Sequence, residues 1–240
     1  MTLCAAWRES LPSGDERVVI ATDSRITGGY RYDFGTKLMT FGRRDCALCW
    51  EGSTSYTYSF AVHAKSDIDW SDVLSSDKAD VDPVCLRIVD VFNEIWAAAQ
   101  GDKGSQFLDD PFSFLFAGYS SKRSKCMAWH IKRGAESRFS ALELSLDEVT
   151  YIGSGRQAAL KVREREPLAS PYAVLQKVIA DPSVDDVGGV SQAYVVSKNE
   201  AYPVGVIKSG ERFLFGRKLA SSGHHLKVVY VPEGQDIPFT

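Results

Sequence analysis

Residues 18 to 27 of this chain read VVIATDSRIT, and residues 2 to 8 read TLCAAWR. Both stretches begin with an apolar run, and the segment between them, SLPSGDE, is polar and contains Pro12 and Gly14. Two apolar runs joined by such a segment are typical of a β-hairpin. We therefore expect the N-terminus to be held inside a β-sheet.

The rest of the chain alternates strands with pairs of helices. The apolar run CALCWEG predicts a strand that ends at Gly52, and residues 53–65 follow with one apolar helical stripe. Apolar residues at steps of three and four predict a second helix over 82–99. The later elements are expected to be a hairpin (112–119 and 125–134), two helices (156–166 and 171–179) and three strands (190–197, 202–210 and 225–232).

This order of elements lacks the strict βαβ alternation of a Rossmann fold. The strands of the hairpin 112–134 are apolar on both faces, so other elements must cover both sides of their sheet. The order fits an α+β fold, a four-layer αββα sandwich of two mainly antiparallel sheets. With 240 residues, of which 44% are hydrophobic, we expect one domain that spans residues 1–240.

Charge and hydropathy exclude several kinds of partner. The formal net charge is −3, and 28 basic and 31 acidic residues are spread along the chain, so no basic stripe for nucleic acid is expected. No segment reaches about 18 consecutive apolar residues, so no membrane span is expected. The first residues, MTLCAAWRESLPSGDE, do not resemble a secretory signal, and we expect a cytoplasmic protein.

Five cysteines form an odd set with irregular spacing. This argues against a disulfide framework and fits buried thiols in a reducing compartment. Cys46 and Cys49 do form a CxxC motif, but residues three apart on a strand point to opposite faces, and no second pair of ligand spacing follows. We interpret them as two core cysteines rather than a metal or redox site, and we expect no metal and no cofactor.

Thr2 carries the first candidate for chemistry. An N-terminal amine has an ordinary pKa of about 7.7 to 8.0, so near neutral pH part of it is a free base. If Met1 is removed, which the small second residue permits, Thr2 holds a hydroxyl nucleophile and a base in one residue. Thr is common as a second residue, so the surrounding sequence must support this interpretation.

Five segments together resemble the β-subunits of proteasomes and their bacterial homologues, which are N-terminal-nucleophile hydrolases. TLCAAWR resembles the mature start of these subunits, and VVIATDSRIT resembles their strand that ends in Asp-Ser-Arg. The segment at Thr36, TKL, resembles the catalytic-lysine strand. CALCWEGST resembles the strand that leads to the oxyanion-hole glycine, and YIGSG (151–155) resembles the Gly-Ser-Gly turn. The resemblance covers most of the first two thirds of the chain.

The resemblance implies roles for three residues around Thr2. Asp23 would pair with Lys37 and hold the ammonium near the Thr2 oxygen, where a positive charge stabilises the developing alkoxide. Ser154 would form a hydrogen bond with the Thr2 amine and orient it. Outside this context, Asp23 would only end a strand and Lys37 would be a solvated surface residue.

Further roles come from the same resemblance. The backbone N–H of Gly52 would donate to the oxyanion, which requires close approach of the backbone. Trp50 lies where the family places a side chain of the primary specificity pocket, although a core tryptophan is an equally good interpretation. In the late motif the chain reads SVDDVGG (183–189). Val187 occupies the expected Ser position, and either Asp185 or Asp186 would supply the acid.

The implied function is a threonine-type peptidase or amide hydrolase. Relatives of this kind enclose their sites, so the resemblance implies a ring-shaped homo-oligomer that acts on peptides or unfolded proteins. The alternatives are a catalytically silent subunit or scaffold, which the Val187 departure favours, and a non-proteolytic amidase of the same superfamily. No phosphate-binding Gly-rich loop with Lys occurs, so any ATPase would be a separate partner.

A serine hydrolase is a weaker hypothesis. The chain has no G-x-S-x-G motif, and its histidines lie in no pattern that nominates a general base. The pair His224 and His225, near the polar C-terminal end, is expected at the surface. The four histidines are His63, His130, His224 and His225.

Overall fold

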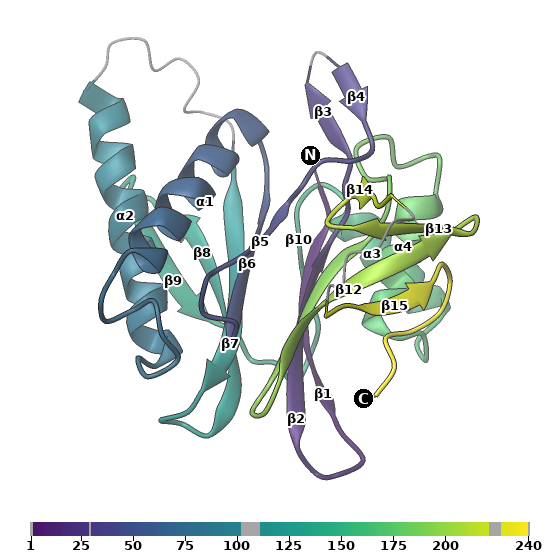
Figure 1. Ribbon diagram of the computed structural model, residues 1–240. Helices are drawn as coiled ribbons and strands as arrows, with labels where there is room; N and C mark the ends of the chain where they lie inside the picture. Colours follow the sequence, from purple (N-terminus) through teal and green to yellow (C-terminus); the bar gives the residue numbers. More distant parts are fainter. Residues whose placement is uncertain (1, 29, 102–110, 221–226, 240) are drawn as a thin grey trace.

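The computed structural model of the protein describes residues 2–28, 30–101, 111–220 and 227–239. Within these residues the strands form an eight-stranded sheet, a five-stranded sheet and a small two-stranded hairpin, accompanied by four α-helices. The two large sheets stand side by side, and each carries helices on its outer face (Figure 1).

The eight-stranded sheet contains the predicted N-terminal hairpin. Strands β1 (Cys4–Ser10) and β2 (Glu16–Thr22) pair antiparallel, with Cys4 opposite Thr22. Every strand pair of this sheet is antiparallel except β12 with β15. Its order is β10-β1-β2-β11-β12-β13-β14, with β15 beside β12. The added strands are β10 (Thr150–Ile152), β11 (Gln192–Ser197), β12 (Ala201–Lys208), β13 (Glu211–Leu214), β14 (Arg217–Lys218) and β15 (Val229–Pro232).

The five-stranded sheet has the order β5-β6-β7-β8-β9 and is antiparallel throughout. It is built from sequence neighbours, because each strand pairs with the next one along the chain. Its central strands are the predicted apolar segments, which are buried on both faces. The strands are β5 (Leu38–Thr40), β6 (Cys46–Glu51), β7 (Ser113–Ser120), β8 (Lys125–Arg133) and β9 (Phe139–Glu143).

The alternation of side chains along the strands divides the interior into three cores. In β6, Cys46, Leu48 and Trp50 pack toward the helices, whereas Ala47 and Cys49 pack toward the other sheet. This confirms that the two cysteines of the CxxC motif face opposite sides of the sheet. The core between the sheets contains many small residues, which allow the two sheets to approach closely.

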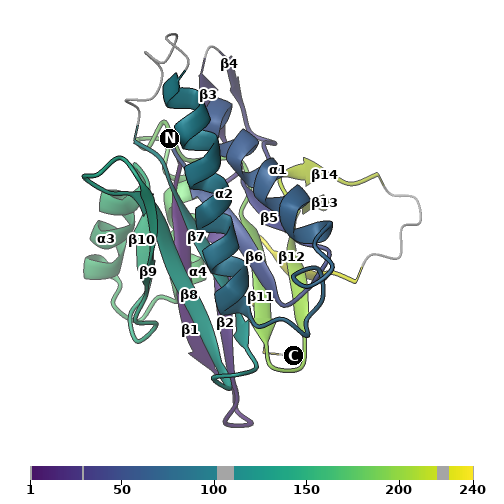
Figure 2. The same cartoon turned by 90° about the vertical axis from the view of Figure 1, so that its left-hand side faces the viewer.

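The helices cover the outer faces in two pairs. Helices α1 (Thr54–Asp69) and α2 (Val81–Gly101) pack on the five-stranded sheet, where phenylalanines and Trp96 form an aromatic core. Figure 2 shows α2 crossing the face of this sheet. Helices α3 (Arg156–Arg165) and α4 (Pro171–Ala180) pack on the eight-stranded sheet. The hydroxyl of Ser170 caps α4 by accepting from the Ala173 N–H, at 3.0 Å.

Several short strands were not predicted from the sequence. The hairpin of β3 (Ile26–Gly28) and β4 (Tyr30–Tyr32) carries exposed side chains, so it has no hydrophobic alternation to reveal it. Strand β9 and the pair β13–β14 were also missed. The strand expected over 225–232 is described as β15, while residues 225 and 226 lie outside the described residues.

The sequence contains no apolar run long enough to predict a membrane span. In the part of the chain that the structure describes, no helix combines the length and the apolar content that crossing a bilayer requires.

Candidate active site

The predicted site residues come from both sheets and meet at one end of the molecule. Thr2 precedes β1, Asp23 follows β2, and Ser154 lies in the turn between β10 and α3. Lys37 precedes β5 and Gly52 follows β6, so these two belong to the five-stranded sheet. The strand ends next to these residues lie at the same end of the two sheets (Figure 1).

The Lys37 ammonium joins the two sheets. Its Nζ lies 2.7 Å from Thr2 Oγ1 and 3.0 and 3.1 Å from the two carboxylate oxygens of Asp23. Lys37, Thr2 and Asp23 are all buried, at 2%, 1% and 0% exposure. An ammonium has three hydrogens to donate, so these contacts are compatible with its geometry. The arrangement places the Lys37 ammonium within hydrogen-bond distance of the hydroxyl oxygen of Thr2.

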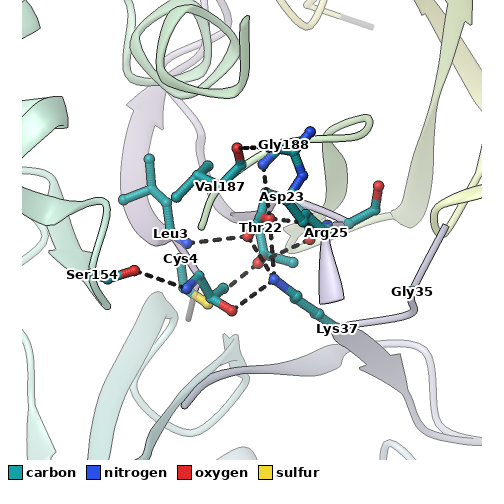
Figure 3. Close-up of polar contacts among 12 residues, drawn as sticks. Leu3, Cys4, Thr22, Asp23, Arg25, Gly35, Lys37, Ser154, Val187 and Gly188 are labelled. Carbon is teal, nitrogen blue, oxygen red and sulfur yellow. Dashed lines mark hydrogen bonds and ion pairs between the residues drawn. The ribbon is translucent and has the colours of Figure 1, made fainter. Parts of the chain in front are cut away.

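Asp23 is held by backbone donors as well as by Lys37. Its Oδ1 accepts from the Leu3 N–H at 3.1 Å, and its Oδ2 accepts from Arg25 N–H at 3.0 Å and Gly188 N–H at 3.2 Å (Figure 3). Burial raises the pKa of Asp23, and the charge of Lys37 and these hydrogen bonds oppose that rise. The carboxylate therefore fixes the ammonium and the start of β1 at once.

Two residues that sequence reasoning missed as functional support this pair. The Gln192 amide nitrogen donates to the carbonyls of Asp23 and Gly35, at 3.1 and 2.7 Å, and its oxygen accepts from the Lys37 N–H at 3.2 Å. Arg25 forms an ion pair with Asp33 and donates to the Val187 carbonyl at 3.0 Å. Gln192 lies in an ordinary strand, so its sequence context carries no signal; Arg25 belongs to the Asp-Ser-Arg motif.

The Thr2 nitrogen meets the predicted Gly-Ser-Gly turn. It donates to Ser154 Oγ at 3.2 Å (Figure 3). The Thr2 carbonyl accepts from the Gly155 N–H, also at 3.2 Å. A Cβ at Gly153 would lie 2.2 Å from the backbone carbonyl oxygen of Thr2, and the φ angle of Gly153 is +93°. Only glycine fits this position, so the turn sits tightly against the nucleophile candidate.

Gly52 lies at the edge of a cavity of about 940 Å³ that also borders Gly153 and Ser154. Its φ is +102°, and an added Cβ would lie 2.5 Å from the Phe112 Cβ. The left-handed backbone and the crowding both require glycine here. The structure thus brings the predicted oxyanion-hole residue and the predicted amine-binding turn to the walls of one cavity.

The late motif behaves differently from the expectation. The Asp185 side chain is 84% exposed and lies 3.7 Å from Arg31, away from Thr2. Asp186 is partly exposed, and among the described residues its side chain forms no hydrogen bond or ion pair. Val187 is buried against Leu3 and Gly155. The loop contributes its backbone, through the Gly188 N–H, instead of a carboxylate.

Trp50 is placed in the core rather than in a pocket. It is 1% exposed and packs in the aromatic core beneath α1, with its ring edge-on to Tyr58 at 6.3 Å. The reason is the alternation along β6, which turns Trp50 to the helix side of the sheet. The wall of the cavity is formed instead by the neighbouring residue, Glu51.

The structure describes two of the four histidines and all five cysteines. His63 is exposed, while His224 and His225 lie outside the described residues. All five cysteines are buried and unpaired with one another as disulfides. Within the described ranges, no group of three or more His, Cys, Asp or Glu side chains could hold a metal ion.

Comparison with known proteins supports the fold. No protein-family model and no curated protein matches the sequence. The chain has a proteasome-like fold of mixed helices and antiparallel sheets. The solved structure of the Anbu (Gly-1) mutant from Hyphomicrobium sp. strain MC1 is similar, with a TM-score of 0.60 over 82% of this chain and 82% of that chain. The two sequences are 16% identical, so the likeness concerns the fold alone.

Proposed function

We propose that this chain is a threonine-type amide hydrolase, acting as a peptidase, with Thr2 as its N-terminal nucleophile after removal of Met1. In this proposal the two helix-covered sheets are the four-layer αββα sandwich of N-terminal-nucleophile hydrolases, formed by a single domain. Within that superfamily, the likeness to the Anbu structure supports the bacterial proteasome homologues as the nearest branch for this proposal.

The contact between Lys37 and Thr2 carries the proposal. A lysine buried to 2% exposure needs a strong reason to be there, because moving an ammonium from water into the interior is costly. Pairing with Asp23 offsets that cost, but pairing alone does not require a hydroxyl at 2.7 Å. A positive charge beside the oxygen of a nucleophile lowers the energy of the alkoxide that forms during attack.

The first half of the reaction would form an ester. The free amine of Thr2 takes the proton from Oγ1, and Oγ1 attacks the carbonyl carbon of the scissile amide. The carbonyl oxygen becomes an oxyanion that the Gly52 N–H stabilises. When this intermediate collapses, the C–N bond breaks, and the leaving nitrogen takes the proton that the Thr2 amine had received.

The second half would return the enzyme to its starting state. A water molecule gives a proton to the Thr2 amine and attacks the ester carbonyl. Collapse of the second tetrahedral intermediate releases the carboxylic acid and returns the proton to Oγ1. The Lys37 ammonium stabilises Oγ1 whenever this oxygen carries negative charge, while Ser154 orients the amine.

The setting of the enzyme belongs to the same proposal. We place it in the cytoplasm, in a closed homo-oligomer, with peptides or unfolded proteins as substrates. Because the sequence has no nucleotide-binding loop of the P-loop type, any energy-dependent unfolding would come from a separate ATPase.

One observation favours a catalytically silent subunit as a second candidate. Val187 supplies an apolar side chain where the family places a hydroxyl, and neither Asp185 nor Asp186 approaches Thr2 through a described contact. The Thr2 nitrogen then has Ser154 as its described hydroxyl partner. The absence of a hydroxyl at position 187 would lower or abolish turnover while leaving the fold intact.

Substitution of the nucleophile separates the two candidates. Cleavage of fluorogenic peptides by the purified full chain should fall to background in Thr2→Ala, and Thr2→Ser should retain part of the activity because it keeps a hydroxyl. Thr40→Ala is the matched control, since this threonine lies in β5 and not at the site. Full activity in Thr2→Ala would place the chemistry elsewhere, and an inactive wild type with Met1 removed would favour the silent subunit.

A further inference from the structure

The cavity beside Thr2 extends past the proposed catalytic residues to a group of polar side chains without a role so far. Glu51, Ser113 and His130 line it together with Gly52, Gly153 and Ser154. Glu51 lies close to the site, because a Cβ at Gly153 would contact both the Thr2 carbonyl and, at 3.3 Å, the Glu51 Cβ. The volume of the cavity, about 940 Å³, is sufficient for more than one substrate residue.

The three polar residues form a chain of hydrogen bonds with a defined direction. Ser113 Oγ donates to Glu51 Oε1 at 2.8 Å and lies 2.9 Å from His130 Nε2. A hydroxyl has one proton, so His130 must donate to Ser113 through an Nε2–H. Burial, with the charge of Lys132, lowers the pKa of His130 to about 4, so the imidazole is neutral near pH 7.

This order of contacts is not that of a serine-protease triad. In such a triad the imidazole lies between the serine and the carboxylate and accepts the serine proton. Here Ser113 lies between His130 and Glu51, and its proton points to the carboxylate. The chain of hydrogen bonds therefore holds Glu51 in place instead of activating Ser113.

Glu51 keeps one carboxylate oxygen available to the cavity. Among the described residues its Oε1 accepts from Ser113, and Oε2 has neither a hydrogen bond nor an ion pair. Burial raises the pKa of Glu51, and the hydrogen bond from Ser113 opposes that rise. Of the lining residues that the structure describes, Glu51 is the acidic one. Arg156, the basic residue of the lining, is exposed to solvent, which screens its charge. The inner wall of the cavity is therefore suited to a cationic group.

The proposed reaction defines which part of a substrate reaches this wall. The leaving nitrogen takes its proton from the Thr2 amine, so the leaving group must lie on the nitrogen side of Thr2. The Thr2 nitrogen faces Ser154, and the Gly153–Ser154 turn is the part of the cavity wall that Glu51 adjoins. Glu51 thus lies on the leaving-group side of the scissile bond.

We propose that Glu51, held by Ser113 and His130, is a specificity residue that binds a lysine or arginine side chain at the first substrate position after the scissile bond. This inference rests on the proposed function only for the direction of the substrate. The binding site itself is defined by the cavity and its carboxylate.

Matched peptides test the proposal by cleavage. Two fluorogenic peptides differ only at the first position after the scissile bond, which is lysine in one and norleucine in the other. The wild type should cleave the lysine peptide with a kcat/KM at least about tenfold higher. Glu51→Gln should bring this ratio close to one, and Glu136→Gln, which changes an exposed carboxylate outside the cavity, should keep the wild-type ratio.

Binding of the leaving fragments keeps the test independent of turnover. Calorimetric titration of the full-length protein with lysyl-glycyl-glycine should show tighter binding than titration with norleucyl-glycyl-glycine, and Glu51→Gln should remove the difference. A preserved difference in an inactive protein would overturn the proposed hydrolase while supporting the pocket.

Other outcomes would overturn the pocket itself. Equal binding and equal cleavage of the lysine and norleucine compounds by the wild type would do so without any variant. If Glu51→Gln fails to fold, Glu51→Asp keeps the charge but shortens its reach, and it should lower the ratio. A wild-type ratio in folded Glu51→Asp and Glu51→Gln proteins would contradict the role of Glu51.

Discussion

Lys37 lies 35 positions after Thr2 in the sequence and is carried by the other sheet. It pairs with Asp23 and at the same time contacts Thr2 Oγ1, and all three side chains are buried. A buried ion pair adds little net stability by itself, but removing one partner leaves an uncompensated charge. Lys37 therefore affects folding and the proposed chemistry together, and a test must measure both.

Replacing Lys37 with Met should abolish peptide cleavage and lower the free energy of unfolding by about 3 kcal/mol, because Asp23 is left buried without its cation. Urea unfolding measures the stability, and reaction with a threonine-directed electrophile measures the reactivity of Thr2. Lys78→Met is the control, since Lys78 is exposed. Wild-type labelling of Thr2 in a folded Lys37→Met protein would contradict the role given to the ammonium.

His130 predicts a pH dependence of stability. Its folded pKa of about 4 lies below the ordinary histidine value of 6.5, so between these values the unfolded chain binds more protons than the folded one. The free energy of unfolding should consequently fall as the pH is lowered from about 7 toward 4. The urea midpoint should lose less between pH 7 and pH 5 in His130→Gln than in wild type.

The exposed His63 provides the control for this measurement. His63→Gln should lose as much stability as the wild type over the same pH interval. An equal loss in wild type, His130→Gln and His63→Gln would mean that His130 titrates normally in the folded protein.

Individual residues were predictable to different degrees. Thr2, Asp23, Lys37, Ser154 and Gly52 lie in short motifs, and the structure places them around one end of the two sheets. Their catalytic roles stay predictions. The contacts of Gln192 and the Glu51–Ser113–His130 chain join strands that are distant in sequence, and no local pattern reveals them. For Trp50, the sequence alone could not decide which face of β6 is the helix side.

At the scale of elements, the turn between β10 and α3 positions the Thr2 nitrogen. Residues 153–155 form this turn, and both of its glycines pack against the N-terminal segment, while the first two residues of the predicted turn, 151 and 152, end β10. The sequence predicted the turn because glycine is used where the backbone must approach closely. Strands β9, β13 and β14 were missed because they are short and largely exposed, so the period-two pattern of a strand is weak.

Gly153→Ala should destabilise the protein and abolish cleavage, because the new Cβ would lie 2.2 Å from the backbone carbonyl oxygen of Thr2. Gly14→Ala is a matched control: its φ of +89° is close to the +93° of Gly153, but nothing lies within 4 Å of its added Cβ. The control should lose only about 1 kcal/mol, the cost of the left-handed backbone. Equal losses in thermal or urea unfolding would show that the contact with Thr2 is unimportant.

At the scale of the whole molecule, the packing of the two sheets sets the geometry of the site. Thr2, Asp23 and Ser154 belong to the eight-stranded sheet, and Lys37 and Gly52 to the five-stranded one. The order of elements predicted two mainly antiparallel sheets accompanied by helices, and the structure has both, in a proteasome-like fold. The distance between the sheets depends on small residues in the core between them.

Enlarging this core should disturb the site from a distance. Ala47 is fully buried between the sheets, so Ala47→Leu should cost about 1 to 3 kcal/mol through overpacking. A shift of about 1 Å between Lys37 and Thr2 should also lower kcat/KM by about 100-fold. Ala64→Leu, equally buried but in α1 on the helix side of the five-stranded sheet, should cost similar stability without this loss of rate. Equal losses of kcat/KM in Ala47→Leu and Ala64→Leu would show that the rate does not depend specifically on the packing between the two sheets.

The central claim is that Thr2 becomes an N-terminal nucleophile that Lys37 activates. The most direct test is mass spectrometry of protein from its native host after treatment with a threonine-directed electrophile, followed by mapping of the adduct. The account predicts an N-terminal peptide that begins at Thr2 and carries the adduct, and no such adduct in the Lys37→Met protein. Retention of Met1 in the whole population, or an adduct on another residue, would contradict it.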